Sequence, residues 1–264
     1  MHLLRDERER RQAAGVTATH RAEANPSGAP RDLEPERSLR RGSPPGACID
    51  ACGSPCVASL AMPRVLLVRH GHVEGIDPPR FRGRRDLPLD EEGHRQARAV
   101  AVHIAAHWQP NALYTSPLRR CAQTAAEIAG ACSLAPLALA DLVDLDYGSW
   151  EWKTHEEVRA QWPQLCESWF ATPQLVRFPE GESLAHLIAR TANVLQRVLE
   201  HHSSDTLVLV GHDSGIRALL MQLLDQPISA YWRLAPEPAS VSEAQIVPGE
   251  VRVLRINETG HLPK

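Results

Sequence analysis

The chain has 264 residues, of which 43% are hydrophobic and 23% are charged, with a formal net charge of -3. These values are typical of a globular protein and give no indication of binding to nucleic acid or to a membrane surface. No apolar run approaches the roughly 18 residues that a membrane span needs, and the N-terminal residues lack a signal-peptide core. Because Cys121, Cys132 and Cys166 are scattered singly, we expect a reduced, cytoplasmic protein.

Residues 1–61 differ in composition from the remainder. They are rich in Arg, Ala, Pro, Glu and Ser, and residues 31–46 have too few apolar side chains to order the chain. We predict a disordered N-terminal extension, and the acidic residues among its arginines argue against a transit peptide. Met62 directly precedes the first predicted strand, so we expect translation to start there, with residues 1–61 an artefact of the assigned start. Residues 62–264 are then the folded domain.

Three cysteines of this extension, Cys48, Cys52 and Cys56, are evenly spaced. Their three-residue gaps are not the usual zinc spacing, and no nearby histidine or fourth cysteine completes a ligand set. We therefore expect no metal site in this segment.

The first predicted strand covers residues 65–68, four apolar positions with two β-branched side chains. It stops at Arg69, His70 and Gly71. In an open α/β sheet, ligands bind just outside the carboxyl ends of parallel strands. A cation, an imidazole and a permissive glycine at this point could form an anion site that holds a nitrogen nucleophile. Taken alone, the motif more often marks an ordinary surface loop.

A loop rich in proline and arginine follows at residues 77–89 and contains Arg80, Arg82, Arg84 and Arg85. This loop is either a solvated basic segment or a rim that attracts an anionic substrate. Asp90 then provides a helix N-cap. The helix after it carries its apolar residues on one face with a 3.6-residue period. These residues are Ala97, Val100, Ala101, Ile104, Ala105 and Trp108.

A second strand is predicted at residues 111–115 and a helix from Leu118 to about Ala129, with Arg119 and Arg120 at its start. Helix N-termini carry free N–H groups and a partial positive charge, which suits a phosphate. Arginine adds a bidentate fork for the same oxygens.

Residues 137–152 are predicted to form an acidic loop that contains Asp141, Asp144 and Asp146, with aromatic side chains that fix it to the body. Residues 154–171 indicate one or two short helices broken at Pro163. A strongly amphipathic helix is predicted from Glu182 onward.

The third strand, residues 206–210, is the most hydrophobic and ends at Gly211 and His212. Asp213 or Ser214 is predicted to cap the helix that follows. Residues 240–247 and 250–257 alternate with period two around a Pro-Gly turn, which predicts an antiparallel hairpin at the sheet edge.

Strands separated by helical stretches predict an α/β fold, a three-layer α/β/α sandwich with a mostly parallel central sheet and an antiparallel edge hairpin near the C-terminus. Three of its strands lead into residues that phosphoryl transfer requires: Arg69 with His70, Arg120, and His212. Three such coincidences at equivalent strand ends favour an anion site over an ordinary loop.

At this point residues 62–264 resemble the histidine phosphatase superfamily, branch 1, with its phosphoglycerate mutase-like fold. Arg-His-Gly alone is a weak signal, but six blocks in order are highly specific. These blocks are Arg69-His70-Gly71, residues 83–97, residues 116–125, residues 147–151, residues 181–184, and Gly211-His212 with Ile216-Arg217.

The resemblance implies that His70 is the nucleophile, which takes the phosphoryl group onto a ring nitrogen. Arg69, Arg120 and His212 would line the phosphate pocket, and Arg82 with Gly83 would lie at the substrate rim. Two guanidinium groups would keep His70 neutral and would stabilise charge on the phosphoryl oxygens, so no metal or cofactor is expected.

Two departures from the family pattern matter. Most members have a glutamate as general acid where this chain has Asp144, which is one methylene shorter. We expect Asp144 to be the acid, with Asp146 and Asp141 as alternatives. In addition, His72-Val73 replaces the usual polar pair after Arg-His-Gly, which removes a hydroxyl and is expected to alter substrate choice.

These features predict a metal-independent phosphomonoesterase that acts on a small phosphorylated metabolite through a phosphohistidine on His70. Within the phosphatases, it could resemble the α-ribazole phosphatases of cobalamin synthesis. A phosphoglycerate mutase is the main alternative, although mutases typically carry Trp-Asn where this chain has residues 74–76, Glu-Gly-Ile. A non-catalytic binding relative is the third alternative, which the retained His70 and Arg120 disfavour.

Overall fold

The computed structural model of the protein describes residues 62–263. The predicted N-terminal extension, including Cys48, Cys52 and Cys56, lies outside the described residues. Within 62–263, no helix is both long enough and apolar enough to cross a membrane.

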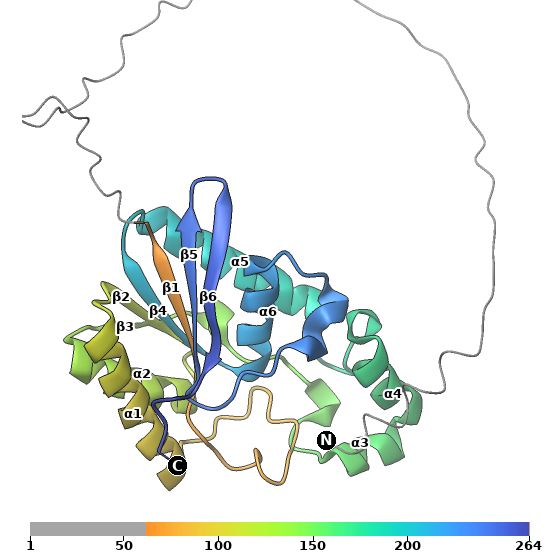
Figure 1. The fold of residues 1–264 in the computed structure, drawn as a ribbon. Coiled ribbons are helices and arrows are strands. Elements are labelled where there is room, and N and C mark those ends of the chain that lie inside the picture. Colours follow the sequence, from red (N-terminus) through yellow and green to blue (C-terminus); the bar gives the residue numbers. More distant parts are fainter. Residues whose placement is uncertain (1–61, 264) are drawn as a thin grey trace, which may run out of the picture. The chain divides into compact units, whose positions relative to one another are not determined.

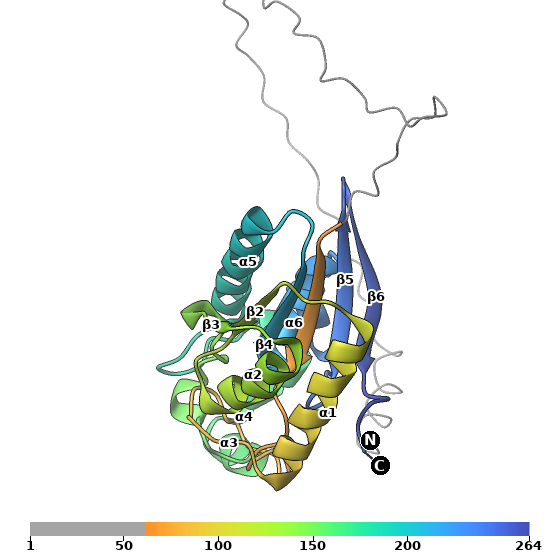
Figure 2. The ribbon, with the colours of Figure 1, turned by 90° about the vertical axis from the view of Figure 1, so that its left-hand side faces the viewer.

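The central sheet has six strands in the order β3-β2-β4-β1-β5-β6. The strands are β1 (Arg64–Arg69), β2 (Ala112–Thr115), β3 (Pro136–Ala138), β4 (Thr206–Gly211), β5 (Val241–Val247) and β6 (Glu250–Glu258). β1 to β4 run parallel, whereas β5 is antiparallel to β1 and β6 is antiparallel to β5. The hairpin of β5 and β6 therefore forms one edge of the sheet (Figure 2). The predicted mostly parallel sheet with an antiparallel edge hairpin is confirmed.

Helices cover both faces of the sheet (Figure 1). The α-helices are α1 (Glu91–His107), α2 (Arg119–Cys132), α3 (His155–Gln161), α4 (Pro163–Ala171), α5 (Leu184–His201) and α6 (Asp213–Leu223). α1 and α2 pack on one face, while α5 and α6 pack on the other. The predicted N-cap of α1 is present, because the Asp90 carboxylate accepts a hydrogen bond from the Gly93 N–H.

A hydrophobic cluster lies on each face of the sheet, because side chains alternate between the two faces along the buried strands. Leu66 and Val68 of β1 face α1 and α2, whereas Val65 and Leu67 face α5 and α6. The four residues of β1 between its terminal arginines, 65–68, are all apolar because both faces of the strand are covered, which is the usual pattern for a central parallel strand.

A third cluster is rich in aromatic side chains and lies beyond the carboxyl ends of the strands. It is built from α3, α4, α5, α6, the short 3-10 helices η3 (Gly148–Trp150) and η5 (Ile228–Arg233), and the loops between them. Its largest buried members are Phe81, Trp150, Trp169, Phe178 and Tyr231. This cluster holds the segments that close over the ends of the strands.

Some local predictions were wrong. The loop predicted from residue 137 begins with β3, which was missed because it is three residues long, exposed, and paired only with the distant β2. Neither Asp213 nor Ser214 caps α6, because His212 occupies the N-cap position and makes no side-chain cap bond. α2 continues to Cys132, beyond the predicted end near Ala129. α5 begins at Leu184 rather than at Glu182, with Ser183 as its N-cap.

Candidate active site

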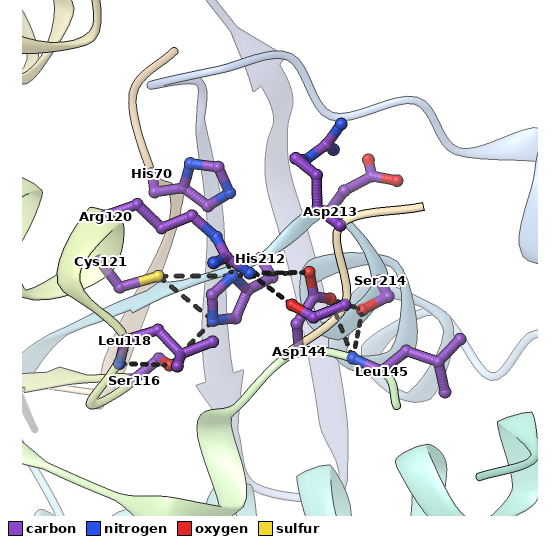
Figure 3. A network of polar contacts seen from close by, with 12 residues as sticks. His70, Ser116, Leu118, Arg120, Cys121, Asp144, Leu145, His212, Asp213 and Ser214 are labelled. Atoms are coloured by element: carbon purple, nitrogen blue, oxygen red, sulfur yellow. Dashed lines mark hydrogen bonds and ion pairs between the residues drawn. The ribbon is translucent and has the colours of Figure 1, made fainter. Parts of the chain in front are cut away.

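Two histidines and an arginine follow three neighbouring strands. His70 directly follows β1, His212 directly follows β4, and Arg120 lies in the first turn of α2, after β2. β4 pairs in parallel with both β1 and β2, so all three strands end at one edge of the sheet. Figure 3 shows the three side chains converging there, and the centroids of the two imidazole rings are 5.3 Å apart.

The His70 ring is held in one tautomer. Its Nδ1 lies 2.7 Å from the carbonyl oxygen of Gly71, and because a carbonyl only accepts, Nδ1 carries the proton and Nε2 keeps its lone pair. The ring is 1% exposed. Burial, followed by the charges of Arg120, His212 and Arg69, lowers the pKa of His70 well below its usual value. His70 is therefore a neutral imidazole with a free nitrogen.

Arg120 is fully buried and connects the strand ends. Its Nε–H donates to Nδ1 of His212 at 3.1 Å, and its two terminal nitrogens donate to the carbonyl oxygens of Arg85 and Gly83, each at 2.7 Å. Because Nδ1 of His212 accepts, the proton of that ring lies on Nε2, which contacts the Ser116 hydroxyl at 2.8 Å. Burial and then the charge of Arg120 lower the pKa of His212 well below its usual value.

Of the three aspartates in the acidic loop, Asp144 is the one that lies in this site. One carboxylate oxygen is 3.2 Å from a terminal nitrogen of Arg120, and the other accepts hydrogen bonds from the Leu145 N–H, at 2.9 Å, and from the Ser214 hydroxyl. Asp146 instead faces the Arg84 guanidinium at 3.3 Å.

Asp141 also lies elsewhere, because its carboxylate faces the exposed Arg197 guanidinium at 3.8 Å. The alternatives to Asp144 therefore form ion pairs on other surfaces. The structure brings only Asp144, among these three, into contact with Arg120.

Arg69 and Arg82 border a cavity of about 230 Å³ that also opens onto Asp144. A terminal nitrogen of Arg69 donates to the Pro236 carbonyl at 2.6 Å, and one of Arg82 donates to the Gly75 carbonyl at 2.6 Å. The Nε–H of each arginine is buried and has no partner within residues 62–263. Two anchored guanidinium groups with spare donors are suited to hold the oxygens of an anion.

Gly83 lies next to the cavity-lining Arg82 but does not line the cavity itself. Its φ is +51°, and a Cβ at this position would lie 2.3 Å from an oxygen of Glu151. Its carbonyl oxygen binds Arg120. The structure thus places Gly83 where its backbone carbonyl orients Arg120, and its position at the substrate rim stays a prediction.

Comparison with known proteins identifies the family. The sequence pattern of the histidine phosphatase superfamily (branch 1) matches residues 65–259. The chain belongs to this superfamily. Phosphoserine phosphatase 1 of Hydrogenobacter thermophilus is 32% identical to this histidine phosphatase over 201 residues, which cover 76% of this chain and 95% of the relative.

Two further comparisons are informative. The probable phosphoglycerate mutase GpmB of Yersinia enterocolitica is 33% identical over 181 residues, covering 69% of this chain and 84% of the relative. The solved structure of a mycobacterial glucosyl-3-phosphoglycerate phosphatase is 25% identical with a TM-score of 0.69, covering 74% of this chain and 99% of that one. The predicted family and the phosphoglycerate mutase-like fold are confirmed.

Two side chains that hold Asp144 in this histidine phosphatase were missed by the sequence analysis. Ser214 was interpreted as a helix cap, yet its hydroxyl donates to Asp144. Arg190 donates to the carbonyl oxygens of Asp141, Val143 and Asp144 at 2.8, 2.6 and 2.9 Å. The sequence gives no local signal for these contacts. Arg190, for example, occupies an ordinary polar position of an amphipathic helix and is brought next to residues 141–144 only by folding.

His72 and Val73, where the sequence departs from its relatives, do not line the cavity. Val73 is buried against Leu89 and Ala97, and Nδ1 of His72 contacts the carboxylate of Asp90 at 2.5 Å. The effect of this pair on substrate choice stays a prediction. Aromatic side chains from more distant segments line the cavity instead.

Proposed function

We propose that this histidine phosphatase hydrolyses the phosphomonoester of a small metabolite through a phosphohistidine on His70. The observation that carries the proposal is the state of the His70 ring, whose Nδ1 proton is held by the Gly71 carbonyl while Nε2 keeps its lone pair. Burial and the neighbouring guanidinium groups keep this ring neutral by lowering its pKa. A neutral nitrogen beside cations can attack a phosphorus whose charged oxygens those cations bind.

In the first step, Nε2 of His70 attacks phosphorus, the N–P bond forms, and the ester P–O bond breaks. Arg69, Arg82 and Arg120 neutralise the equatorial oxygens as the phosphoryl group moves, which needs no metal ion. Asp144 acts as the general acid and gives a proton to the departing oxygen, so that the product leaves as an alcohol.

In the second step, the Asp144 carboxylate accepts a proton from a water molecule whose oxygen attacks phosphorus. The N–P bond breaks, inorganic phosphate departs, and His70 returns to its neutral state. The hydrogen bonds from Ser214 and Leu145 restrict the motion of the shorter aspartate side chain, which supports this role.

A phosphoglycerate mutase is the second candidate, and the 33% identity to the probable mutase of Yersinia enterocolitica favours it. A mutase performs the same first step but returns the phosphoryl group to the bound product instead of to water. Hydrolysis is favoured by the resemblance to phosphoserine phosphatase 1, which spans nearly the whole relative.

The test is incubation with p-nitrophenyl phosphate, then with 3-phosphoglycerate and its bisphosphate primer. We expect phosphate release that falls at least about 1,000-fold in His70→Ala. The matched control is His72→Ala, a neighbouring histidine whose Nδ1 contacts the Asp90 carboxylate, and this variant is expected to retain activity. Rapid quenching and peptide mapping should find the phosphoryl group on His70 in the native enzyme.

Each alternative has its own outcome. Isomerisation of 3-phosphoglycerate without phosphate release would assign the chain to the mutases. No turnover of any phosphoester, together with no phosphorylation of His70, would assign it a binding role.

A further inference from the structure

Two aromatic side chains stand partly exposed in the cavity beside the proposed phosphate site. Phe170 of α4 is 41% exposed and Trp232 of η5 is 38% exposed, and both line the cavity. Their rings are stacked, with centroids 5.3 Å apart and an interplanar angle of 29°. Large aromatic rings that remain in contact with water beside a binding site are available to cover an apolar ligand.

The Trp232 ring is fixed in its position. Its indole N–H donates to the carbonyl oxygen of Trp169 at 2.7 Å, and Trp169 itself is fully buried. The Arg217 guanidinium lies 5.1 Å from the Trp232 ring centroid and is anchored by Asp213, which its Nε contacts at 3.0 Å. A ring held by a hydrogen bond and a cation loses little freedom when a ligand packs against it.

The Phe170 ring continues this surface toward α3. The His155 ring lies 5.6 Å from it in an edge-to-face arrangement, and His155 also lines the cavity. Burial lowers the pKa of His155, which keeps this ring neutral. The stretch from His155 through Phe170 to Trp232, here called the aromatic wall, is therefore uncharged along its length.

The charged groups that line the cavity have other partners or roles. Arg69 and Arg82 belong to the proposed phosphate site, and Asp144 is the proposed acid. The Asp213 carboxylate also lines the cavity, where it pairs with Arg217 at 3.0 Å and lies 3.5 Å from Arg69. Arg80 also lines the cavity, but its guanidinium donates to the Trp152 carbonyl at 2.7 Å and pairs with Glu157 at 3.8 Å. The part of the cavity that would receive the leaving group thus offers chiefly ring surfaces.

We propose that the preferred substrates are phosphomonoesters whose alcohol carries an aromatic ring, and that this ring packs against Phe170 and Trp232 while the phosphate lies at Arg69 and Arg82. The proposal rests on the proposed phosphatase function, because it assigns the leaving group of that reaction. It separates this chain from phosphatases of small polar esters such as phosphoserine, because Phe170 has no polar atom and the Trp232 indole N–H is already bound to Trp169, so neither ring can hydrogen-bond the ammonium or carboxylate group.

The first experiment compares esters that share the same breaking bond. Adenosine 5′-monophosphate and ribose 5-phosphate have the same primary alkoxide as leaving group and differ in the aromatic base, and 2-phenylethyl phosphate and ethyl phosphate form a second such pair. We expect kcat/KM to be about tenfold or more higher for the aromatic member of at least one pair, the scale of one buried aromatic contact. Phosphoserine should be a poor substrate.

Variants of the wall then test whether it causes the preference. Phe170→Ala and Trp232→Leu are each expected to reduce the ratio of kcat/KM within the preferred pair at least about threefold. Trp232→Phe keeps a ring and should retain most of the ratio of kcat/KM within the preferred pair. This variant replaces Trp232→Leu if Trp232→Leu folds poorly. Leu175→Ala is the matched control, because Leu175 is a 77% exposed apolar side chain close in sequence that does not line the cavity.

A binding measurement separates failure of this proposal from failure of the proposed function. Titration calorimetry of His70→Ala compares 3-phenylpropylphosphonate with propylphosphonate, which cannot be hydrolysed. Tighter binding of the aromatic phosphonate supports the proposal even if no ester is turned over. Equal dissociation constants, an unchanged ratio in both wall variants, or phosphoserine as the best substrate would each overturn it.

Discussion

The proposed active site is made of two regions that are built in different ways. The first, here called the floor, comprises Arg69, His70, Arg120 and His212 at the ends of adjacent strands. Backbone carbonyl groups fix most of its side chains: that of Gly71 binds His70, and those of Gly83 and Arg85 bind Arg120. The floor is thus held by the sheet itself and by the loops next to it.

The second region carries Asp144 and the aromatic wall, and it belongs to no strand. Asp144 lies between two 3-10 helices, and its position depends on side chains from α5 and α6. Phe170 and Trp232 come from two further segments that meet in the third hydrophobic cluster. The comparison indicates that nucleophile and phosphate binding follow from topology, whereas the acid and the leaving-group surface depend on contacts between distant segments.

Within the second region, the largest expected effect concerns Asp144. Replacing Asp144 by Asn removes the proton donor and is expected to lower kcat for an alkyl phosphate at least about 100-fold, the scale of general acid catalysis. The loss in the phosphorylation step should be much smaller for p-nitrophenyl phosphate, whose leaving group departs without a proton. Single-turnover kinetics on both esters measures this difference.

Two neighbouring aspartates serve as controls for that prediction. Asp141→Asn removes a carboxylate that faces an exposed arginine, and its rate should stay near normal. A near-normal rate in Asp144→Asn combined with a large loss in Asp146→Asn would instead assign the acid to Asp146.

The floor can be tested by the pH dependence of folding. Burial lowers the pKa of both His70 and His212, so below pH about 6.5 the unfolded chain binds protons at these two positions that the folded chain does not. The free energy of unfolding should therefore fall as the pH is lowered, and these two sites add up to about 2.7 kcal/mol per pH unit. Above pH about 7.5 their contribution is constant.

Urea unfolding of the wild type and of His70→Asn between pH about 5 and 8 measures this slope. In the variant, the slope of the free energy of unfolding against pH should be smaller by the contribution of one histidine, about 1.4 kcal/mol per pH unit. An identical slope in the two proteins would mean that His70 does not lose a proton on folding, and the neutral nucleophile would be refuted.

The same division explains what could be predicted from the sequence. A short apolar run followed by Arg-His-Gly, or by Gly-His, identifies a buried strand and its polar end within a few residues, so β1, β4 and the floor were predictable. β3 was not, because its three exposed residues pair only with β2. Ser214 has the local chemistry of a helix cap, and its bond to Asp144 spans 70 residues.

Arg190 provides the next test, because it holds the backbone on either side of Asp144. Arg190→Met leaves three carbonyl oxygens without this donor, so we expect a loss of about 2 kcal/mol in the free energy of unfolding and about tenfold in kcat. If Arg190 positions the acid, kcat should fall more for alkyl phosphates than for p-nitrophenyl phosphate. An equal loss on both esters would assign it a structural role only.

A matched control for Arg190 lies on the same helix. Arg197 is also in α5, but its side chain is 62% exposed and faces the Asp141 carboxylate at 3.8 Å. Arg197→Met is expected to change the free energy of unfolding by less than about 0.5 kcal/mol, as is usual for an exposed ion pair. Its kcat should stay the same as that of the wild type.

The smallest expected effect concerns Asp213, where two influences on phosphate binding oppose each other. Its carboxylate lies 3.5 Å from Arg69 and could orient that guanidinium, but its charge also repels a phosphate in the cavity that it lines. Arg69 is anchored independently by the Pro236 carbonyl at 2.6 Å, and 3.5 Å is too long for a strong hydrogen bond. We therefore expect repulsion to dominate, so that Asp213→Asn lowers the inhibition constant of inorganic phosphate.

The change should be about threefold at low salt and should shrink as ionic strength rises above about 0.1 M, because screening weakens the repulsion that was removed. Asp225→Asn removes the same charge beyond the other end of α6, about 16 Å along an eleven-residue helix, and should have no such effect. Weaker phosphate binding in Asp213→Asn at every salt concentration would show instead that Asp213 orients Arg69. The floor would then depend on a side chain of α6, as the wall does.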